Sequence, residues 1–125
     1  VLALLPNAYR QGDVCGLNMA GLETIYDRAI PMNAIGFFGL HMLTAGSYSG
    51  EEYVIQTDSS YKKLVTSQGV LKGYILVGDV ARAGIYTALI RDETPLETID
   101  YELIKEKPQL IAFSKGNRDR VLGGA

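Results

Sequence analysis

Cysteine, histidine and tryptophan are nearly missing from this chain of 125 residues, which has one cysteine, one histidine and no tryptophan. A single cysteine excludes an internal disulfide framework and suits a reducing cytoplasm. The only histidine, His41, excludes a multi-histidine metal site within this chain, and we interpret it as a structural or hydrogen-bonding residue. The sequence also has no GxGxxG motif, no P-loop and no paired nucleophile and base. We therefore predict no catalytic residue and no metal site here.

An excess of one charge is also missing, since 12 basic and 14 acidic residues are interspersed along the chain. This balance provides no basic surface for nucleic acid or for an anionic membrane. No apolar run approaches the ~18 residues of a membrane span, so we expect a soluble, cytoplasmic chain with neither partner. Lys62 and Lys63 follow Tyr61, and we interpret the two lysines as a solvated strand edge that resists aggregation.

The first twenty residues have the spacing of a helix with a stripe of small side chains on one face. The stripe consists of Ala8, Gly12, Cys15, Gly16 and Met19. An interior glycine costs a helix about 1 kcal/mol relative to alanine, so two glycines on one face predict tight packing against a partner. We expect that partner to be a nucleotide-binding domain outside this chain, which we take to be a fragment of a longer protein. Cys15 is predicted to be a buried structural thiol.

The start of this helix has no evident side-chain cap. Pro6 suits the first helical position, where its missing N–H costs nothing, and Leu5 then takes the cap position. Because leucine accepts no hydrogen bond, the first-turn N–H groups favour an anion or another external acceptor. In the alternative interpretation, Asn7 caps a helix that begins one or two residues later.

The middle of the chain has the pattern of an antiparallel β-meander of four to five strands. Aromatic and aliphatic residues are dense in 33–45, and its two glycines disfavour helix, so we predict one strand with a bend. Turn residues occupy 46–50, and a second strand is expected over 52–57. Strands over 61–66 and 70–77 flank Ser67, Gln68 and Gly69, the spacing of a hairpin with a glycine in its turn.

Helical periodicity returns towards the C-terminus, which makes the fold class α+β, with C-terminal helices packed on the sheet. A helix is expected over 81–92, with its apolar face formed by Ala81, Ile85, Ala88 and Leu89. Thr94 and Glu97 have capping-box spacing, so a short helix should begin there. Another helical turn is expected over 101–105, ending before Pro108, and 114–125 has the composition of a flexible tail.

Gly78 and Asp79 follow a run of apolar residues, like the Gly-Asp segment that ends a flavin-domain strand and whose carboxylate holds the ribityl chain. The uncapped helix expected after such a motif lies much earlier in this chain. We therefore interpret Gly78 and Asp79 as the exit from the meander into a packing helix. A self-contained nucleotide binder that uses this motif is the alternative.

The segment LLPNAYRQGDVCGLNMAG resembles the helix that follows the flavin-binding Gly-Asp motif in the pyridine nucleotide-disulfide oxidoreductase superfamily. The remainder is similar to the C-terminal interface domain of that superfamily, particularly in rubredoxin reductases, NAD(P)H-nitrite reductase flavin subunits and NADH oxidases. The residues that carry the resemblance are Pro6, Gln11, Gly12 and Asn18 in the helix, and Ile30 and Pro31 leading to GLHMLTAG.

The resemblance implies a cofactor-binding role for the backbone of Leu5, Pro6, Asn7 and Ala8, which match the family segment beside the pyrimidine end of the isoalloxazine. It also implies that Met32–Phe38 lies near a flavin of its own or a neighbouring subunit. This chain lacks the tryptophan of the ferredoxin-reductase Phe-Trp-Ser-Asp-Gln run. The histidine–glutamate pair of glutathione-reductase-like enzymes is not recognisable either, because His41 lacks the His-Pro context.

The resemblance further implies a domain organisation and a function. Residues 1–29 would be the terminal helix of an FAD-binding domain, 30–113 the interface or dimerisation domain, and 114–125 the tail. The parent would pass electrons from NAD(P)H through FAD to a protein or small-molecule acceptor, with FAD and NAD(P)H as its cofactors. We expect the isolated chain to retain neither cofactor and to be inactive, with the missing domains, a second copy and an acceptor protein as partners. A non-enzymatic homodimerising interaction domain is the alternative.

Overall fold

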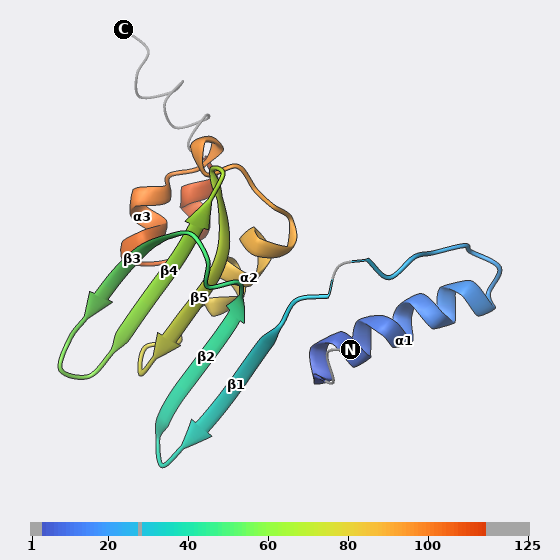
Figure 1. Ribbon diagram of the computed structural model, residues 1–125, viewed down its shortest axis with the longest axis horizontal. Helices are drawn as coiled ribbons and strands as arrows, with labels where there is room; N and C mark the ends of the chain where they lie inside the picture. Colours follow the sequence, from blue (N-terminus) through green and yellow to red (C-terminus); the bar gives the residue numbers. More distant parts are fainter. Residues whose placement is uncertain (1–3, 28, 115–125) are drawn as a thin grey trace, which may run out of the picture.

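A computed structural model describes residues 4–27 and 29–114 of the chain, as one helix, a five-stranded sheet and a set of C-terminal helices (Figure 1). The expected α+β class is confirmed. The elements in chain order are α1 Leu5–Met19, β1 Met32–Phe37, β2 Leu40–Gly46, β3 Glu51–Gln56, β4 Tyr61–Ser67, β5 Val70–Val77, α2 Ala83–Arg91, the 3-10 helix η1 Leu96–Thr98, α3 Tyr101–Glu106 and the 3-10 helix η2 Leu110–Ser114.

The sheet is antiparallel throughout and has the strand order β1-β2-β5-β4-β3. It departs from a simple meander once, because β3 lies at the opposite edge from β1 and the β2–β3 connection must pass over β5 and β4. The β2–β3 connection runs close to the backbone of β5, because a Cβ on Gly73 of β5 would collide with the Ser47 carbonyl oxygen. Glycine at position 73 therefore permits this crossing.

The predicted bent strand over 33–45 is wrong, because the structure divides this segment into the β1–β2 hairpin. Phe37 pairs with Leu40, which leaves Phe38 and Gly39 as a two-residue turn with φ values of 47° and 84°. Positive φ at both central positions is the signature of a type I′ turn. Sequence reasoning missed it because asparagine or aspartate, not phenylalanine, is the usual first residue of such a turn.

The hydrophobic core lies between one face of the sheet and the C-terminal helices. Tyr74 of β5 and Tyr86 of α2 meet at its centre, with ring centroids 5.7 Å apart. The Tyr86 hydroxyl donates to the Ile104 carbonyl oxygen at 2.9 Å, and this hydrogen bond links α2 to α3. The buried core residues are Ala45, Leu64, Leu71, Tyr74, Leu76, Ala83, Tyr86, Leu89, Ile99, Ile104 and Ala112.

Two expectations about the C-terminal helices need correction. Helix α2 begins at Ala83 and buries Ala83, Tyr86 and Leu89, whereas Ala81, which we placed on the apolar face, is exposed before the helix. The capping box at Thr94 and Glu97 does not form, since η1 has no side-chain cap and is a single 3-10 turn.

The turn predicted over 101–105 is confirmed as α3, which ends before Pro108. The Asp100 carboxylate accepts from the Leu103 backbone N–H at 3.2 Å and caps its start.

The interpretation of Lys62 as a solvated edge residue is also wrong, because β4 is an interior strand. The Lys62 ammonium donates to the carbonyl oxygens of Lys105 at 3.1 Å and Glu106 at 2.6 Å, at the C-terminal end of α3. Partial burial lowers the pKa of Lys62, while the nearby carboxylates of Asp79 and Glu106 raise it less strongly. Lys63, by contrast, forms an ion pair with Glu52 of the neighbouring edge strand β3.

None of the helices in the described part of the chain combines the length and apolar character needed to cross a membrane. The tail predicted over 114–125 lies outside the described residues, except that Ser114 ends η2.

Candidate functional site

Helix α1 lies apart from the sheet and is accompanied by the chain segment that returns from it towards β1 (Figure 1). Asn7 and Asn18 bind this segment near the two ends of the helix. The Asn7 amide donates to the Ile30 carbonyl oxygen at 3.0 Å, and its oxygen accepts from the Ile30 N–H at 3.2 Å and the Tyr26 hydroxyl at 3.0 Å. Asn18 similarly donates to the Thr24 carbonyl oxygen at 2.8 Å and accepts from its N–H at 2.9 Å.

The spacing of the two asparagines explains this arrangement. They are separated by about three helical turns of 3.6 residues, so both amides emerge on the same side of α1. Asn7 is only 2% exposed although it belongs to an otherwise exposed helix. The alternative in which Asn7 caps the helix is therefore wrong: its side chain fixes the return segment instead.

The N-terminus of α1 is uncapped, as the sequence predicts, although the helix begins one residue earlier. Leu4 takes the cap position, and its carbonyl oxygen accepts from the Ala8 N–H at 2.9 Å. Among the residues that the structure describes, no side chain caps the first turn, which also contains no acidic residue. Leu5, Pro6 and Ala8 are exposed around it. The arrangement presents backbone N–H groups and the positive end of a helix dipole to an external acceptor.

The small-residue stripe of α1 is exposed along its whole length. A Cβ added to Gly12 or Gly16 would meet no atom within 4 Å, and Met19 is exposed. The prediction of a buried Cys15 is wrong for this chain, because the thiol lies on the exposed stripe. Within the described residues, the packing partner that these glycines predict is absent.

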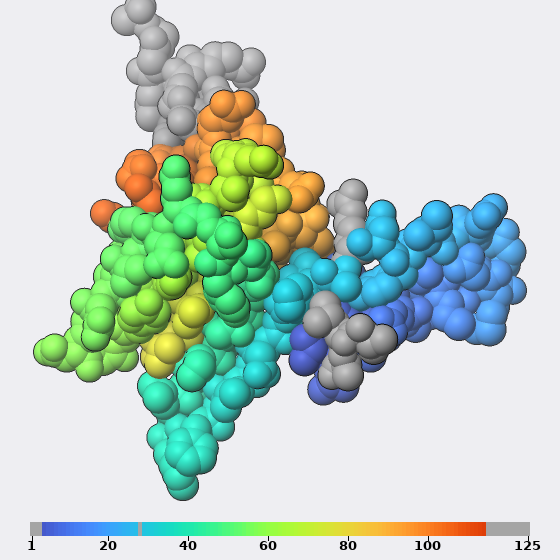
Figure 2. Space-filling view, viewed as in Figure 1, coloured from blue at the N-terminus to red at the C-terminus, as the bar shows by residue number. Residues whose placement is uncertain are grey.

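The predicted flavin-facing segment 32–38 does not gather around the start of α1. The N-terminal end of segment 32–38 adjoins the return segment. Along β1 the chain then moves away from the start of α1 by about 3.3 Å per residue. Phe37 and Phe38 stack edge-to-face at the hairpin tip, with centroids 4.6 Å apart, and are 67% and 96% exposed. Figure 2 shows this tip and the α1 segment as separate projections from the molecule.

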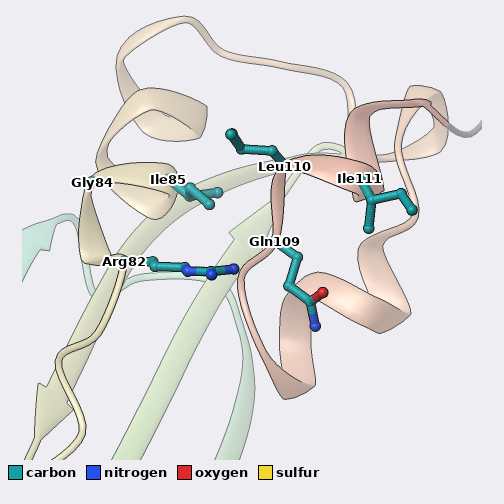
Figure 3. A pocket seen from close by; sticks show the side chains of 6 residues that line it. All are labelled: Arg82, Gly84, Ile85, Gln109, Leu110 and Ile111. Atoms are coloured by element: carbon teal, nitrogen blue, oxygen red, sulfur yellow. The ribbon is translucent and has the colours of Figure 1, made fainter.

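A cavity of about 690 Å³, which sequence analysis did not predict, opens between the start of α2 and η2. Figure 3 shows Ile85 and Leu110 together beside the Arg82 side chain. Gly84, Gln109 and Ile111 complete the lining. The lining provides apolar contact and one guanidinium, but no nucleophile–base pair.

Two core tyrosines have strongly shifted pKa values. Burial, together with a smaller effect of the neighbouring Glu102 carboxylate, raises the pKa of Tyr101 to about 12. Burial likewise raises the pKa of Tyr86. Because both hydroxyls stay protonated at neutral pH, these shifts do not indicate a general base.

Gly78 and Asp79 form the exit from β5 into α2, which confirms their interpretation. Gly78 has φ of 79°, and the Asp79 carboxylate accepts from the Ala81 N–H at 3.0 Å. His41 is exposed on β2, opposite Gly36. In the described ranges, no three side chains of the metal-binding types lie close enough together to hold an ion.

Comparison with known proteins connects the chain to redox enzymes. No family model matches it. It is 34% identical, over a match of 108 aligned positions, to the epsilon subunit of the NADH-dependent phenylglyoxylate dehydrogenase of Aromatoleum evansii, and the match covers 77% of this chain. The chain spans only 26% of the length of that relative. It is therefore similar to part of an oxidoreductase subunit.

Proposed function

We propose that this chain is the C-terminal part of an FAD-dependent NAD(P)H oxidoreductase of the rubredoxin reductase, nitrite reductase and NADH oxidase type. The observation that carries the proposal is the exposed, uncapped and acid-free first turn of α1, which the buried Asn7 anchors. Similarity to a subunit of an NADH-dependent dehydrogenase supports the same class of chemistry. FAD, when bound in the parent, supplies the transfer of electrons from NAD(P)H to an acceptor.

The residues of the first turn fit the electron-rich edge of a flavin. Pro6 has no N–H, so the donors come from its neighbours, and the small side chain of Ala8 leaves room for a planar ring. The dipole of α1 would stabilise negative charge at the pyrimidine end by about 1 kcal/mol. Asn7 would act through its backbone and as a positioning residue, because its side chain already binds Tyr26 and Ile30.

The rest of the chain would serve assembly. The exposed stripe of α1 matches a helix that packs on the missing FAD domain, and the sheet with its helices would form the interface domain. We place the FAD and NAD domains of the parent, a second copy and an electron-acceptor protein among the partners. Residues 1–29 and 30–113 remain the proposed division between the two domains.

Redox titration of the parent protein tests the flavin assignment. Bulky replacements such as Ala8→Leu and Pro6→Leu should shift the flavin potential or lower its occupancy, because they obstruct approach to the first turn. Cys15→Ala, on the packing stripe, should change either property less. The isolated chain should be colourless after purification, since it holds only one edge of the site. Stoichiometric flavin in the isolated chain, or unchanged potentials in both first-turn variants, would remove the support for this function.

A further inference from the structure

The cavity between the start of α2 and η2 has apolar walls that are accessible to solvent. It measures about 690 Å³, and its lining consists of Arg82, Gly84, Ile85, Gln109, Leu110 and Ile111. Leu110 is 75% exposed and Ile111 is 56% exposed. A volume of this size lies within the range of roughly 300–1,000 Å³ that holds small organic ligands. Because covering exposed apolar side chains removes them from water, the cavity favours a ligand with an apolar body.

Arg82 provides the charge of this cavity. Among the lining residues that the structure describes, it is the only charged one, and none is acidic. Its guanidinium forms no ion pair or hydrogen bond with another described residue. The carboxylate of Asp79, which precedes it in the chain, accepts from the Ala81 N–H. A guanidinium binds a carboxylate through two parallel N–H···O hydrogen bonds, so charge complementarity favours a carboxylate as the polar group of the ligand.

The backbone at Arg82 is left-handed, with φ of 57° and ψ of 25°. This conformation is unfavourable for a residue with a side chain, and strained residues of this kind cluster at ligand-binding sites. In the same β5–α2 connection, the positive φ at position 78 is taken by a glycine. The backbone alone would likewise favour glycine at position 82, so the arginine there indicates a role for its guanidinium. Figure 3 shows the Arg82 side chain extending from the start of α2 beside the 109–111 segment.

We propose that this cavity binds a small organic monocarboxylate with an apolar body. The carboxylate pairs with Arg82, and the apolar body covers Ile85 and Leu110. Gly84 leaves room for the ligand, since a Cβ at this position would meet no atom within 4 Å. A peptide fits less well, because its backbone carries a donor and an acceptor at each residue and, in the described lining, only Gln109 has a neutral polar side chain. The ligand site lies on the sheet body and goes beyond the flavin contact proposed for α1.

Amide chemical shifts of the 125-residue chain, measured during a titration with octanoate, test this binding. Octanoate should shift the amides of Gly84, Ile85, Leu110 and Ile111, and the shifts should saturate at millimolar concentrations or below. Octanamide has the same apolar chain without the charge and should bind about fivefold more weakly. Acetate, which has the charge without the chain, should produce no saturable shift. The titration needs no flavin, so its outcome is separate from that of the proposed function.

Substitutions in the cavity separate the charge from the apolar contact. Arg82→Gln should bind octanoate and octanamide equally, whereas Arg91→Gln, at the other end of α2, is the matched control and should keep the preference for octanoate. Gly84→Leu should abolish the binding of both, because the new side chain fills the cavity, and should retain its far-UV circular dichroism, because the added Cβ meets no neighbour. The absence of saturable shifts with octanoate would overturn the proposal. Shifts centred on residues outside the lining, or an undiminished preference for octanoate in Arg82→Gln, would overturn it equally.

Discussion

Tyr86 and Tyr101 place two phenol hydroxyls in the core, and only one of them has a hydrogen-bond partner. Tyr86 donates to the Ile104 carbonyl oxygen, whereas the buried Tyr101 oxygen has no partner among the described residues. A buried polar atom without a partner costs about 1–3 kcal/mol, whereas a made hydrogen bond contributes about 1 kcal/mol. The two hydroxyls should therefore have opposite effects on stability.

We predict that Tyr86→Phe lowers the free energy of unfolding by about 1 kcal/mol or more, because the Ile104 carbonyl also loses its donor. Tyr101→Phe should leave stability unchanged or raise it, since the ring that faces Lys105 is kept. Urea unfolding at neutral pH measures both changes. Equal destabilisation by the two variants would contradict the assignment.

Ionisation of the two tyrosines should lower the free energy of unfolding at alkaline pH. A folded-state pKa of about 12 for Tyr101 exceeds the ordinary value of 10, so the folded chain binds more protons than the unfolded chain between these values. Stability is therefore complete below pH 10 and falls as the pH rises towards 12. The decline should be shallower in Tyr101→Phe, which unfolding curves over this interval would reveal.

The role of Asn7 could not be predicted from the sequence. A polar residue in the first helical turn is ordinarily a cap, and nothing local indicates that its amide binds Ile30, which is 23 positions away. Its partners follow from tertiary structure. The uncapped helix start could be predicted because it depends only on the residue types around Pro6.

We predict that Asn7→Ala detaches the return segment from α1, with a local loss of about 2 kcal/mol from its three hydrogen bonds. Amides of α1 and of residues 22–30 should exchange faster, whereas those of β5 should not change. Asn18→Ala, on the exposed end of the same helix, should have a smaller effect. Faster exchange in β5 as well would show that Asn7 supports the whole fold instead.

At the scale of elements, the sequence predicts the bounds of β5 but not the β1–β2 hairpin or the buried face of α2. The residues of β5 were predicted with their observed bounds, because two β-rich runs flank a glycine turn. The β1–β2 hairpin was missed, since Phe38 occupies a turn position that its side chain does not favour. The burial pattern of α2 depends on which side meets the sheet, and periodicity alone could not distinguish Ala81 from Ala83.

Replacing the glycines of α1 by alanine should stabilise the helix in the isolated chain but weaken its packing in the proposed parent protein. In the isolated chain, Gly12→Ala and Gly16→Ala should each stabilise α1 by about 1 kcal/mol, seen as roughly fivefold slower amide exchange in the helix. Neither new methyl group meets a neighbour there. In the parent, the same changes should weaken packing of α1 on the FAD domain and lower the yield of flavin-loaded protein. Unchanged loading would indicate that the stripe faces no close partner.

At the scale of the whole molecule, α1 and the sheet body have few described contacts with each other. The sequence predicts a packing partner for the stripe of small residues on α1, and the part of the chain that the structure describes leaves this stripe exposed. Sequence analysis could not predict the cavity beside Arg82, whose lining comes from segments on either side of α3. Such a juxtaposition depends on how the helices return over the sheet.

The strand order has a consequence for the path by which the chain folds. Strands β3, β4 and β5 are consecutive neighbours, so they can form from short loops with little loss of chain entropy. The β1–β2 hairpin is also local, but it joins the sheet only when β2 reaches β5 across the intervening strands. Since pairings between distant segments are slow to form, we expect the β1–β2 hairpin and the three-stranded β3–β5 meander to assemble independently and then dock. Gly73, which allows the β2–β3 connection to cross, would therefore affect the docking step more than the formation of either unit.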